Sequence, residues 1–450
     1  MQGNVIRKIV PERCQVLIGD AQDLGKCEDA APDAIKKCEG GIPNVRFRGF
    51  KDDWEQRKCG DVLNERNIQH PQSEEFPLVS FTVENGVTSK TERYEREQLV
   101  RGSKEAKKYK ETRLDDIVYN PANLKFGAIA RNKLGNAVFS PIYVTYEVDK
   151  SLALPSFVEM FVTRNNFIQN ALQYQQGTVY ERMSVSTADF ATLDITLPSI
   201  AEQKQIGQYF QQLDHLITLH QRKCDETKEL KKYMLQKMFP RDGEKVPEIR
   251  FQGFTGEWEQ RRLGELIVKG GSGGTPLSSN SSYYDGTIPF LSITDITKSN
   301  GFIYDTEKHI SEEGLNSSSA WIVPKEAISL AMYASVGKVA ILKENIATSQ
   351  AFYNMIFEDD CIRNFVYQYL RKMEENDAWI PYISTGTQAN LNAEKVKNLM
   401  LLLPKTNNEM KKISDCLFYI DHLIDLRQRK CDELKELKQY MLRNMFPQKR

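Results

Sequence analysis

Two stretches of the chain are nearly the same and decide its fold. Gln221–Pro240 reads QRKCDETKELKKYMLQKMFP and Gln428–Pro447 reads QRKCDELKELKQYMLRNMFP, identical at 16 of 20 positions. A second pair precedes them: Pro43–Gly60 (PNVRFRGFKDDWEQRKCG) and Pro247–Gly264 (PEIRFQGFTGEWEQRRLG) are identical at 10 of 18 positions. The offsets, 207 and 204 residues, are far longer than a solenoid unit of about 20–50 residues. The chain therefore contains two copies of one domain plan.

The segments between these matched stretches differ. Residues 61–190 and 265–390 look almost unrelated in sequence. A physical explanation is that the matched frameworks meet equivalent partners while the two middles meet different ones. Duplication followed by uneven drift is the alternative.

The matched ends predict two long helices, over residues 199–239 and 406–446. Each begins just after a proline, with a hydroxyl residue three positions before a glutamate: Ser199 with Glu202, and Thr406 with Glu409. This spacing is typical of a capping box, in which the glutamate reaches back to the cap's own N–H. Each ends at Met-Phe-Pro, where proline cannot continue the helix.

Apolar residues in both segments recur every seven positions, in two interleaved rows, which is the pattern of a coiled-coil seam. In the first helix the rows are Phe210, Ile217, Cys224 and Met238, with Ile206, Leu213, Thr227 and Met234. In the second they are Leu417, Ile424, Cys431 and Met445, with Ile413, Ile420, Leu434 and Met441. Because a compact domain usually has its termini close together, we expect an antiparallel pair with a globular domain at each end. Two amphipathic helices packed separately on their own domains are the alternative.

Both variable regions mix strand-like runs with helical patterns, which predicts an α+β fold for each. The strand-like runs are Pro77–Val83, Asp116–Tyr119, Ala137–Tyr146, Ile288–Ile293, Ala327–Met332 and Lys338–Leu342. The helical patterns are Pro155–Tyr174 and Cys361–Glu374.

Composition excludes several classes of protein. The 450 residues carry 61 basic and 61 acidic side chains and are 40% hydrophobic, which is typical of a folded, soluble chain. We find no membrane span, no secretory leader, and eight cysteines without a C-x-x-C pair, so we expect a cytoplasmic protein with reduced thiols. The five histidines have no metal-ligand spacing. No phosphate-binding loop and no acid–base pair stand out, so we predict no catalytic residues, no metal and no bound cofactor.

Charge is concentrated in the first variable region. Residues 101–133 hold nine basic and four acidic residues, a local excess of five positive charges. Such an excess favours binding to a phosphate backbone. The candidate DNA-binding residues in this region are Lys90, Arg93, Arg101, Lys104, Lys107, Lys108, Lys110, Arg113, Lys125, Tyr174, Gln175, Thr178, Tyr180 and Arg182.

The second variable region offers small hydroxyl and amide side chains, which can contact bases or phosphates without net charge. Its Gly270–Pro276 segment (GGSGGTP) reads as a flexible loop. For any one of these residues, an ordinary exposed position is the simpler explanation; the clustering is the signal. The candidates are Ser272, Thr275, Ser278, Asn280, Tyr283, Tyr284, Lys338, Thr385, Thr387, Gln388 and Asn390.

The whole arrangement resembles the specificity subunit of type I restriction–modification systems. The resemblance rests on the two matched pairs, on the Leu-Pro entries at Leu197-Pro198 and Leu403-Pro404, and on Gly177-Thr178 and Gly386-Thr387 before each helix. It covers about residues 43–450.

The resemblance implies an α+β chain with two target recognition domains, each reading one half of a split double-stranded DNA site, joined by two long antiparallel coiled-coil helices. It also implies two methyltransferase subunits docked on the helices, with S-adenosylmethionine. A restriction–translocase subunit, using ATP and magnesium, completes the complex. The implied boundaries are residues 43–198 and 241–404 (with its linker) for the recognition domains and 199–240 and 405–450 for the helices. Residues 1–42 form an extension of unknown role.

Two other functions remain open. A two-headed protein–protein scaffold with a coiled-coil spacer also suits the duplication, although the basic stretch favours nucleic acid. A self-sufficient nuclease or methylase is disfavoured by the missing motifs.

Overall fold

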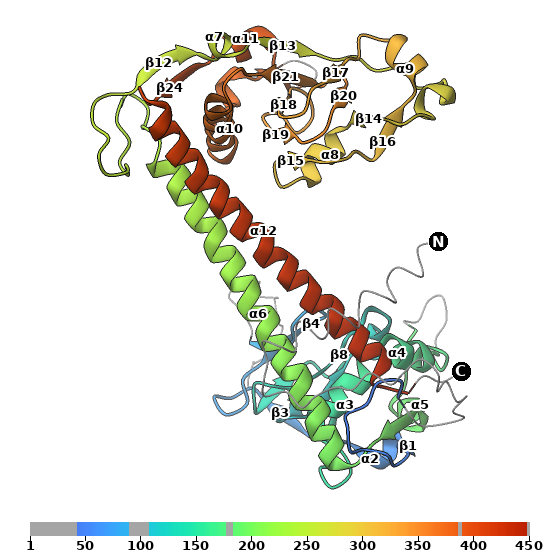
Figure 1. The fold of residues 1–450 in the computed structure, drawn as a ribbon. Helices are drawn as coiled ribbons and strands as arrows, with labels where there is room; N and C mark the ends of the chain where they lie inside the picture. Colours follow the sequence, from blue (N-terminus) through green and yellow to red (C-terminus); the bar gives the residue numbers. More distant parts are fainter. Residues whose placement is uncertain (1–42, 90–107, 177–182, 386–388, 448–450) are drawn as a thin grey trace. The chain divides into compact units, whose positions relative to one another are not determined.

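The computed structural model describes residues 43–89, 108–176, 183–385 and 389–447 (Figure 1). Its chain divides into two compact units. The first unit runs to Ile217 and resumes at Asp432, and the second spans Thr218–Cys431. Each unit therefore contains a variable domain and one part of each long helix, α6 (Ile200–Lys237) and α12 (Asn407–Asn444).

In the first unit the variable domain has a four-stranded and a three-stranded sheet. The four-stranded order is β2 (Leu63–Glu65), β10 (Val144–Val148), β7 (Ile117–Tyr119) and β8 (Ile129–Arg131). The three-stranded order is β3 (Gln69–Pro71), β6 (Lys108–Thr112) and β9 (Ala137–Phe139), beside a β4 (Val79–Thr82) and β5 (Gly86–Ser89) hairpin. The helices are α2 (Cys59–Val62), η3 (Leu124–Phe126), α3 (Pro155–Val162), α4 (Asn165–Leu172) and α5 (Thr187–Thr192).

In the second unit the variable domain is built from different sheets. The five-stranded order is β13 (Lys269–Ser272), β21 (Phe352–Ile356), β18 (Ile328–Ala331), β19 (Val339–Leu342) and β15 (Phe302–Ile303). The four-stranded order is β16 (Lys308–Ile310), β14 (Ile288–Leu291), β20 (Ile346–Thr348) and β17 (Ile322–Val323). A hairpin joins β22 (Ser384–Thr385) to β23 (Ala389–Asn390). The helices are α7 (Leu263–Leu266), η4 (Ser281–Tyr284), α8 (Ile293–Lys298), α9 (Glu312–Asn316), α10 (Asp360–Glu375), η5 (Ile380–Tyr382) and α11 (Ala393–Lys397).

The predicted α+β class is confirmed, and most strand-like runs form strands. The exception is Ala137–Tyr146, predicted as one run. It forms β9 and β10, which belong to different sheets. A turn at Ser140–Tyr143, which includes Pro141, separates them. Proline has no N–H to give to a sheet, so the strand ends there. The predicted helical run over residues 155–174 likewise divides into α3 and α4.

The matched frameworks fold in the same way in both units. β1 (Glu55–Lys58) pairs antiparallel with β11 (Asp194–Leu197), and β12 (Glu259–Arg262) pairs antiparallel with β24 (Met400–Leu403). The second strand of each ladder, β11 or β24, is followed directly by a long helix, α6 or α12. The corresponding residues Glu55 and Glu259 stand opposite Leu197 and Leu403. Repeated sequence has therefore produced a repeated register.

Each unit also contains one aromatic triad with the same geometry. In the first unit Trp54 lies 5.7 Å from Phe157, and Phe157 lies 5.5 Å from Phe446, between ring centroids. In the second unit the matching distances are 5.6 Å from Trp258 to Phe365 and 5.3 Å from Phe365 to Phe239. Phe239 and Phe446 are the phenylalanines of the two Met-Phe-Pro ends. The end of each long helix is thus buried in the unit where the other long helix begins.

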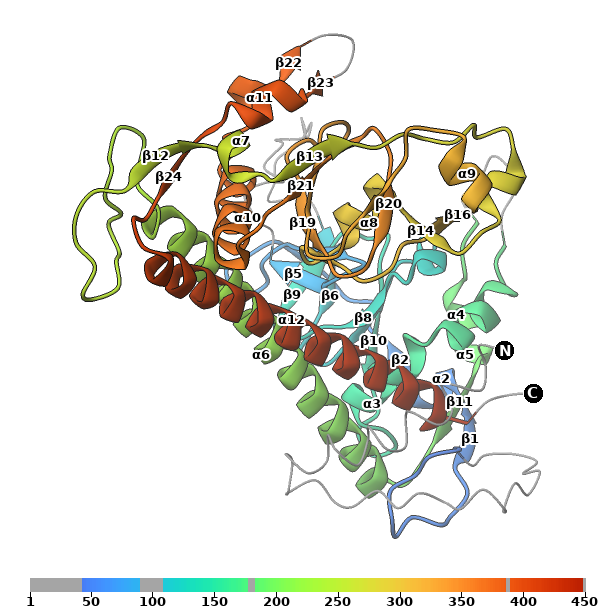
Figure 2. The same ribbon diagram turned by 45° about the horizontal axis from the view of Figure 1, so that its top comes forward.

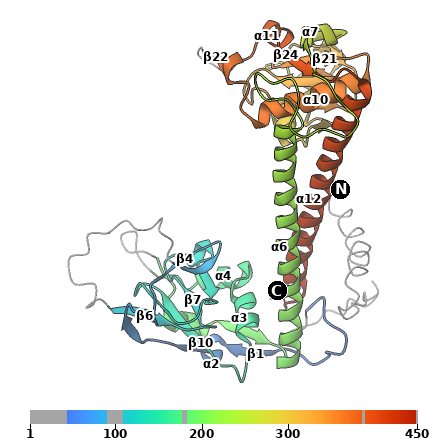
Figure 3. The same cartoon turned by 90° about the vertical axis from the view of Figure 1, so that its left-hand side faces the viewer.

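The two helices lie side by side and run antiparallel within each unit (Figures 1 and 3). In the first unit Lys438 Nζ lies 2.5 Å from Asp214 Oδ1. In the second, Lys231 Nζ lies 2.5 Å from Asp421 Oδ1, and Cys431 Sγ lies 3.4 Å from Gln221 Oε1.

Most of the predicted seam is buried. Its buried members are Ile206, Phe210, Leu213, Cys224, Thr227, Met238, Ile413, Leu417, Ile420, Cys431, Leu434, Met441 and Met445. Ile217, Met234 and Ile424 are half-buried. No helix among the described residues is both long and apolar enough to cross a membrane.

Candidate nucleic-acid interface and its framework

A buried arginine–glutamate clamp joins each framework segment to the helix that follows it. In the first unit Arg46 donates from Nε to Glu202 Oε1 at 2.7 Å and from its terminal nitrogen to Oε2 at 2.8 Å. In the second, Arg250 makes the same two contacts with Glu409 at 2.7 and 2.9 Å. Two parallel bonds of this kind fix both the position and the angle of the pair.

The predicted capping boxes form only in part, because the glutamate side chains bind the clamp arginines. Ser199 and Thr406 do accept from the N–H groups of Glu202 and Glu409, at 3.4 and 3.3 Å. The glutamate side chains, however, bind the clamp arginines rather than the cap N–H groups. They are nearly fully buried, and a buried carboxylate requires a charged partner. The carboxylate also lies in the first turn of its helix, where negative charge is favourable.

Among the described residues of the first variable domain, some of the predicted basic side chains are exposed and others are paired or buried. Lys108 and Lys125 are exposed. Arg113 is half-exposed and donates from Nε to the buried Glu111 at 2.6 Å. Lys110 is buried, and its Nζ donates to Glu65 at 2.9 Å and Asn67 at 2.8 Å. The prediction for Lys110 is therefore corrected: its charge is neutralised inside the domain and stabilises the β6 region.

Lys125 lies in η3, within the loop of residues 120–127 that follows β7, and it is the one residue of this loop that was predicted to bind DNA. Its Nζ lies 4.9 Å from the ring centroid of Phe126, and that ring is 62% exposed. The loop ends at Gly127, whose φ of +81° favours glycine. An exposed aromatic ring beside a cation is suited to contact with nucleic acid. A Lys-Phe-Gly sequence alone gives no signal of this exposure.

A second exposed segment of this domain lies beside that loop. Helix α4 packs against η3, and the N–H of Val185 donates to Pro121 at 3.3 Å. Tyr174 follows α4 and is 46% exposed, and Gln175 donates to the Met183 carbonyl at 3.0 Å. The backbones of Gln176 and Ser184 pair antiparallel. The structure thus brings Lys125, Tyr174 and Gln175 onto neighbouring segments.

The second variable domain carries a corresponding hairpin, β22–β23, which stands away from the two sheets (Figure 2). Thr385 lies in β22 and Asn390 in β23. Asn390 also forms a backbone bridge with Tyr333, which is 37% exposed. Beside Tyr333, Ala334 has a positive φ of +47°. Such a conformation is strained for a residue other than glycine and is common at binding sites.

Tyr333 and its neighbours were not among the predicted residues. Ser335 Oγ lies 3.2 Å from Thr297 Oγ1 of α8, so two hydroxyl groups meet two residues after Tyr333. Lys338, which was predicted, forms an ion pair with Glu374 at 2.9 Å. The strained backbone, the one sign that distinguishes this loop, cannot be read from sequence.

The GGSGG segment is not the flexible loop that its composition predicts. Residues 269–272 form β13, paired with β21. Gly273 and Gly274 are buried, and a Cβ on either would lie 1.7 Å from the Thr348 carbonyl oxygen or 2.3 Å from Ser319 Oγ. These glycines permit close packing rather than motion.

The remaining candidates of this region follow β13. Ser272, Thr275 and Ser278 are exposed, and Thr275 donates to Gln350 at 2.6 Å. Asn280 caps η4, and the Tyr284 hydroxyl donates to the Pro276 carbonyl at 2.7 Å. Tyr283 is half-buried.

Ten predicted residues lie outside the described part of the chain: Lys90, Arg93, Arg101, Lys104, Lys107, Thr178, Tyr180, Arg182, Thr387 and Gln388. The described residues contain no group of three or more His, Cys, Asp or Glu side chains placed to hold a metal ion.

Comparison with known proteins identifies one family. The model of the type I restriction modification DNA specificity domain matches residues 161–229 and 255–436, more than half of the chain. The chain is 29% identical over 194 residues to the type I restriction enzyme MjaIX specificity subunit of Methanocaldococcus jannaschii, an alignment covering 42% of this chain and 44% of that protein. It is 28% identical over 150 residues to the HindI specificity subunit of Haemophilus influenzae, covering 33% and 32%. The chain thus spans less than half the length of these two relatives.

Solved structures support the fold. The crystal structure of a type I restriction–modification S subunit from M. genitalium aligns with a TM-score of 0.58 and 13% identity, over 91% of this chain and all of that one. A chain from a study of type I system assembly and conformational transition aligns with a TM-score of 0.52 and 18% identity, over 86% and 96%.

Proposed function

We propose that this chain, which belongs to the type I restriction modification DNA specificity family, recognises a split double-stranded DNA sequence in the cytoplasm, with one half-site read by each variable domain. Residues 43–198 and 241–404 are the proposed recognition domains, and residues 199–240 and 405–450 the helices that connect them. One observation carries the proposal: the frameworks repeat in register and side-chain contacts, while the two variable domains have different sheet orders. Two variable domains that have different sheets on the same framework are suited to reading two different half-sites.

The proposed DNA-facing surface of the first domain includes Lys108, Lys125, Phe126 and Tyr174, together with the predicted residues of 90–107 and 177–182. In the second domain it includes the β22–β23 hairpin and Tyr333, with Ser272, Thr275 and Ser278. Lysines would contact phosphates and set affinity, whereas hydroxyl, amide and aromatic groups would contact bases.

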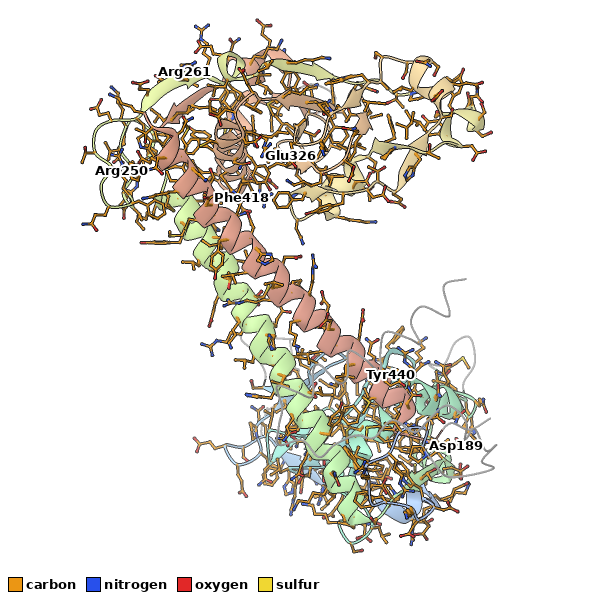
Figure 4. The ribbon with its side chains drawn as sticks, in the orientation of Figure 1. Asp189, Arg250, Arg261, Glu326, Phe418 and Tyr440 are labelled. Atoms are coloured by element: carbon orange, nitrogen blue, oxygen red, sulfur yellow. The ribbon has the colours of Figure 1, made fainter. Side chains whose placement is uncertain are left out.

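The helix pair offers a repeated surface to a partner. In the second unit Leu230, Tyr233, Tyr419 and Leu426 are between 47% and 63% exposed. The heptad phase places all four on one side of the pair, outside the seam. Leu437 and Tyr440, the repeats of Leu230 and Tyr233, occupy the same phase in the first unit, where Tyr440 is 39% exposed (Figure 4).

The part of this surface that repeats in both units, Leu230 and Tyr233 with Leu437 and Tyr440, favours two copies of one partner. We therefore propose one methyltransferase subunit on each surface, carrying S-adenosylmethionine, with a restriction–translocase subunit using ATP and magnesium in the larger complex. In this proposal the chain itself supplies no catalytic residue.

The decisive experiment maps methylated bases in the genome of a host that expresses the methyltransferase subunit with or without this chain. The proposal expects methylation confined to one split motif, and only when the chain is present. Methylation that does not depend on the chain, or that follows a single unsplit motif, would contradict it.

A binding experiment tests the DNA surface separately. Lys125→Glu should weaken binding to duplexes of any sequence and make the dependence of affinity on salt less steep, because a phosphate contact carries no sequence information. Lys51→Glu, at an exposed framework position, serves as the matched control. Equal affinities of the two variants for DNA at low salt would show that Lys125 is not part of the DNA-facing surface.

A further inference from the structure

The aromatic triads make the two units comparable element by element. Because Phe157 of α3 and Phe365 of α10 occupy the same place between a tryptophan and a Met-Phe-Pro phenylalanine, α3 and α10 are equivalent helices. They differ in length: α3 ends at Val162, whereas α10 continues to Glu375. Tyr367, two residues after Phe365 in α10, contacts the long helix α12 of the second unit.

The contact between α10 and α12 is aromatic. Tyr367 of α10 is 1% exposed, and its ring stacks on Phe418 of α12 with centroids 5.5 Å apart and an interplanar angle of 11°. Phe302 of the variable domain lies 5.8 Å from the same Phe418 ring. Pairs of this kind stabilise a contact beyond the apolar area they bury.

Polar contacts extend the attachment along α12. The amide of Asn300 donates to Asp425 Oδ1 at 3.1 Å. Gly301 follows with a φ of +90°, and a Cβ there would lie 1.9 Å from the Tyr367 hydroxyl. The ion pair of Lys231 with Asp421 lies in the same region, close enough to Arg371 of α10 for their charges to interact. We call Asn300, Phe302, Tyr367, Phe418 and Asp425 the brace.

The first unit has no equivalent of these contacts among its described residues. Glu159 occupies the position of Tyr367 and binds Arg131 at 3.0 Å and Lys133 at 2.9 Å, within its own domain. Gln211 occupies the position of Phe418 and is exposed. The ion pair of Asp214 with Lys438, which repeats that of Asp421 with Lys231, is open to solvent, with 54% and 31% of the side chains exposed.

We infer that the brace is a positioning device, which holds the second variable domain in one orientation on its own part of the helix pair. The inference rests on the proposed function for its consequence: a fixed orientation restricts which spacing between half-sites the second domain can accept. In its described residues the first domain lacks this aromatic contact and meets its long helix differently: Gln203 of α6 accepts from the N–H of Leu154 at 2.8 Å and donates to the Leu152 carbonyl at 3.2 Å.

The test compares the full chain with Phe418→Ala, with Asn300→Ala and with the matched control Gln211→Ala. Hydrogen–deuterium exchange on the chain alone is the first readout. Both brace variants should exchange faster in residues 299–303 and 367–375, and the control should match the unchanged chain. Asn300 is exposed, so its variant should fold even if Phe418→Ala does not, and Phe418→Leu should restore part of the protection.

Methylation mapping in the presence of the methyltransferase subunit is the second readout. Brace variants should gain methylation at sites whose gap is one base pair longer or shorter, with both half-site sequences unchanged. If folded brace variants keep the original gap as strictly as Gln211→Ala, the inference is wrong. If the unchanged chain directs no methylation to a split site, the proposed function fails, while the exchange experiment still decides whether the brace holds the domain.

Discussion

Glu202 and Glu409 each satisfy two requirements at the start of a long helix. The backbone of each residue is capped by a hydroxyl, and the carboxylate is held by an arginine from the preceding framework segment. The same arginines also donate to carbonyl groups of their own segment, Asp52 for Arg46 and Gly256 for Arg250. A single arginine therefore fixes a loop and a helix terminus together, which explains why this residue is kept in both repeats of the chain.

Removing the clamp should be costly. In Arg46→Ala the buried carboxylate of Glu202 loses its partner, and we expect a loss of about 3–5 kcal/mol in the free energy of unfolding. Denaturant or thermal unfolding measures this loss. Lys51→Ala, in the same segment but exposed, should stay within about 0.5 kcal/mol of the unchanged chain. A similar small effect of Arg46→Ala would show that the clamp adds no stability.

The buried thiol of Cys59 makes the stability of the folded chain depend on pH. Burial raises the pKa of its thiol from 9.0 to about 12. A thiol with a raised pKa keeps its proton in the folded chain and loses it in the unfolded chain. Its contribution to stability is thus complete below pH 9 and is lost as the pH rises toward 12. Relative to Cys59→Ala, the unchanged chain should lose about 1.4 kcal/mol per pH unit over this window. A stability difference that does not change with pH would contradict the assignment.

At the scale of elements, the seam of the helix pair combines apolar and polar layers. Cys224 and Cys431 occupy equivalent buried positions, and each thiol lies near a glutamine of the other helix, Gln428 and Gln221 respectively. The Lys231–Asp421 pair adds a buried charged layer in the second unit. A polar layer of this kind favours one register over others.

The two Lys–Asp pairs permit a matched comparison of buried and exposed charge. Asp421→Ala leaves Lys231 buried without its partner and should cost about 3–5 kcal/mol. Asp214→Ala breaks the exposed repeat of the same pair and should cost at most about 1 kcal/mol. Unfolding of both variants under one set of conditions measures the difference. Equal losses would mean that burial does not distinguish the pairs.

At the scale of the whole chain, one framework supports two variable domains with different topologies. The ladders β1–β11 and β12–β24 enclose each variable domain at its two ends. The ladder and the arginine–glutamate clamp are the same in both units, so the sheets between them can differ without disturbing these contacts. The sheets between these ends therefore vary freely in strand order, while the frameworks retain their contacts.

Because the framework is shared, a whole variable region should be exchangeable between family members. Replacing residues 265–390 with the corresponding region of another family member should change one half of the methylated motif and leave the other half unchanged. Methylation mapping of the hybrid measures both halves at once. A change in both halves would show that the two domains do not read DNA independently.

Sequence determined the features that depend on local pattern. The repeat, the extents of the two helices and most of the seam follow from identity and seven-residue spacing, because neighbouring turns of a helix place such side chains on one face. The α+β class and most strands follow from runs of apolar and β-branched residues.

Tertiary structure decided the features that depend on contacts between distant residues. The buried Lys110 is bound by Glu65 and Asn67, which lie 45 and 43 positions away in the sequence. Glu202 binds Arg46, which lies 156 positions away. Gly273 is packed by Thr348, and Phe418 is covered by Tyr367 in one unit while its repeat, Gln211, is exposed in the other. A charge or a glycine has no fixed role in a linear pattern. Its role depends on the burial and partners that folding supplies.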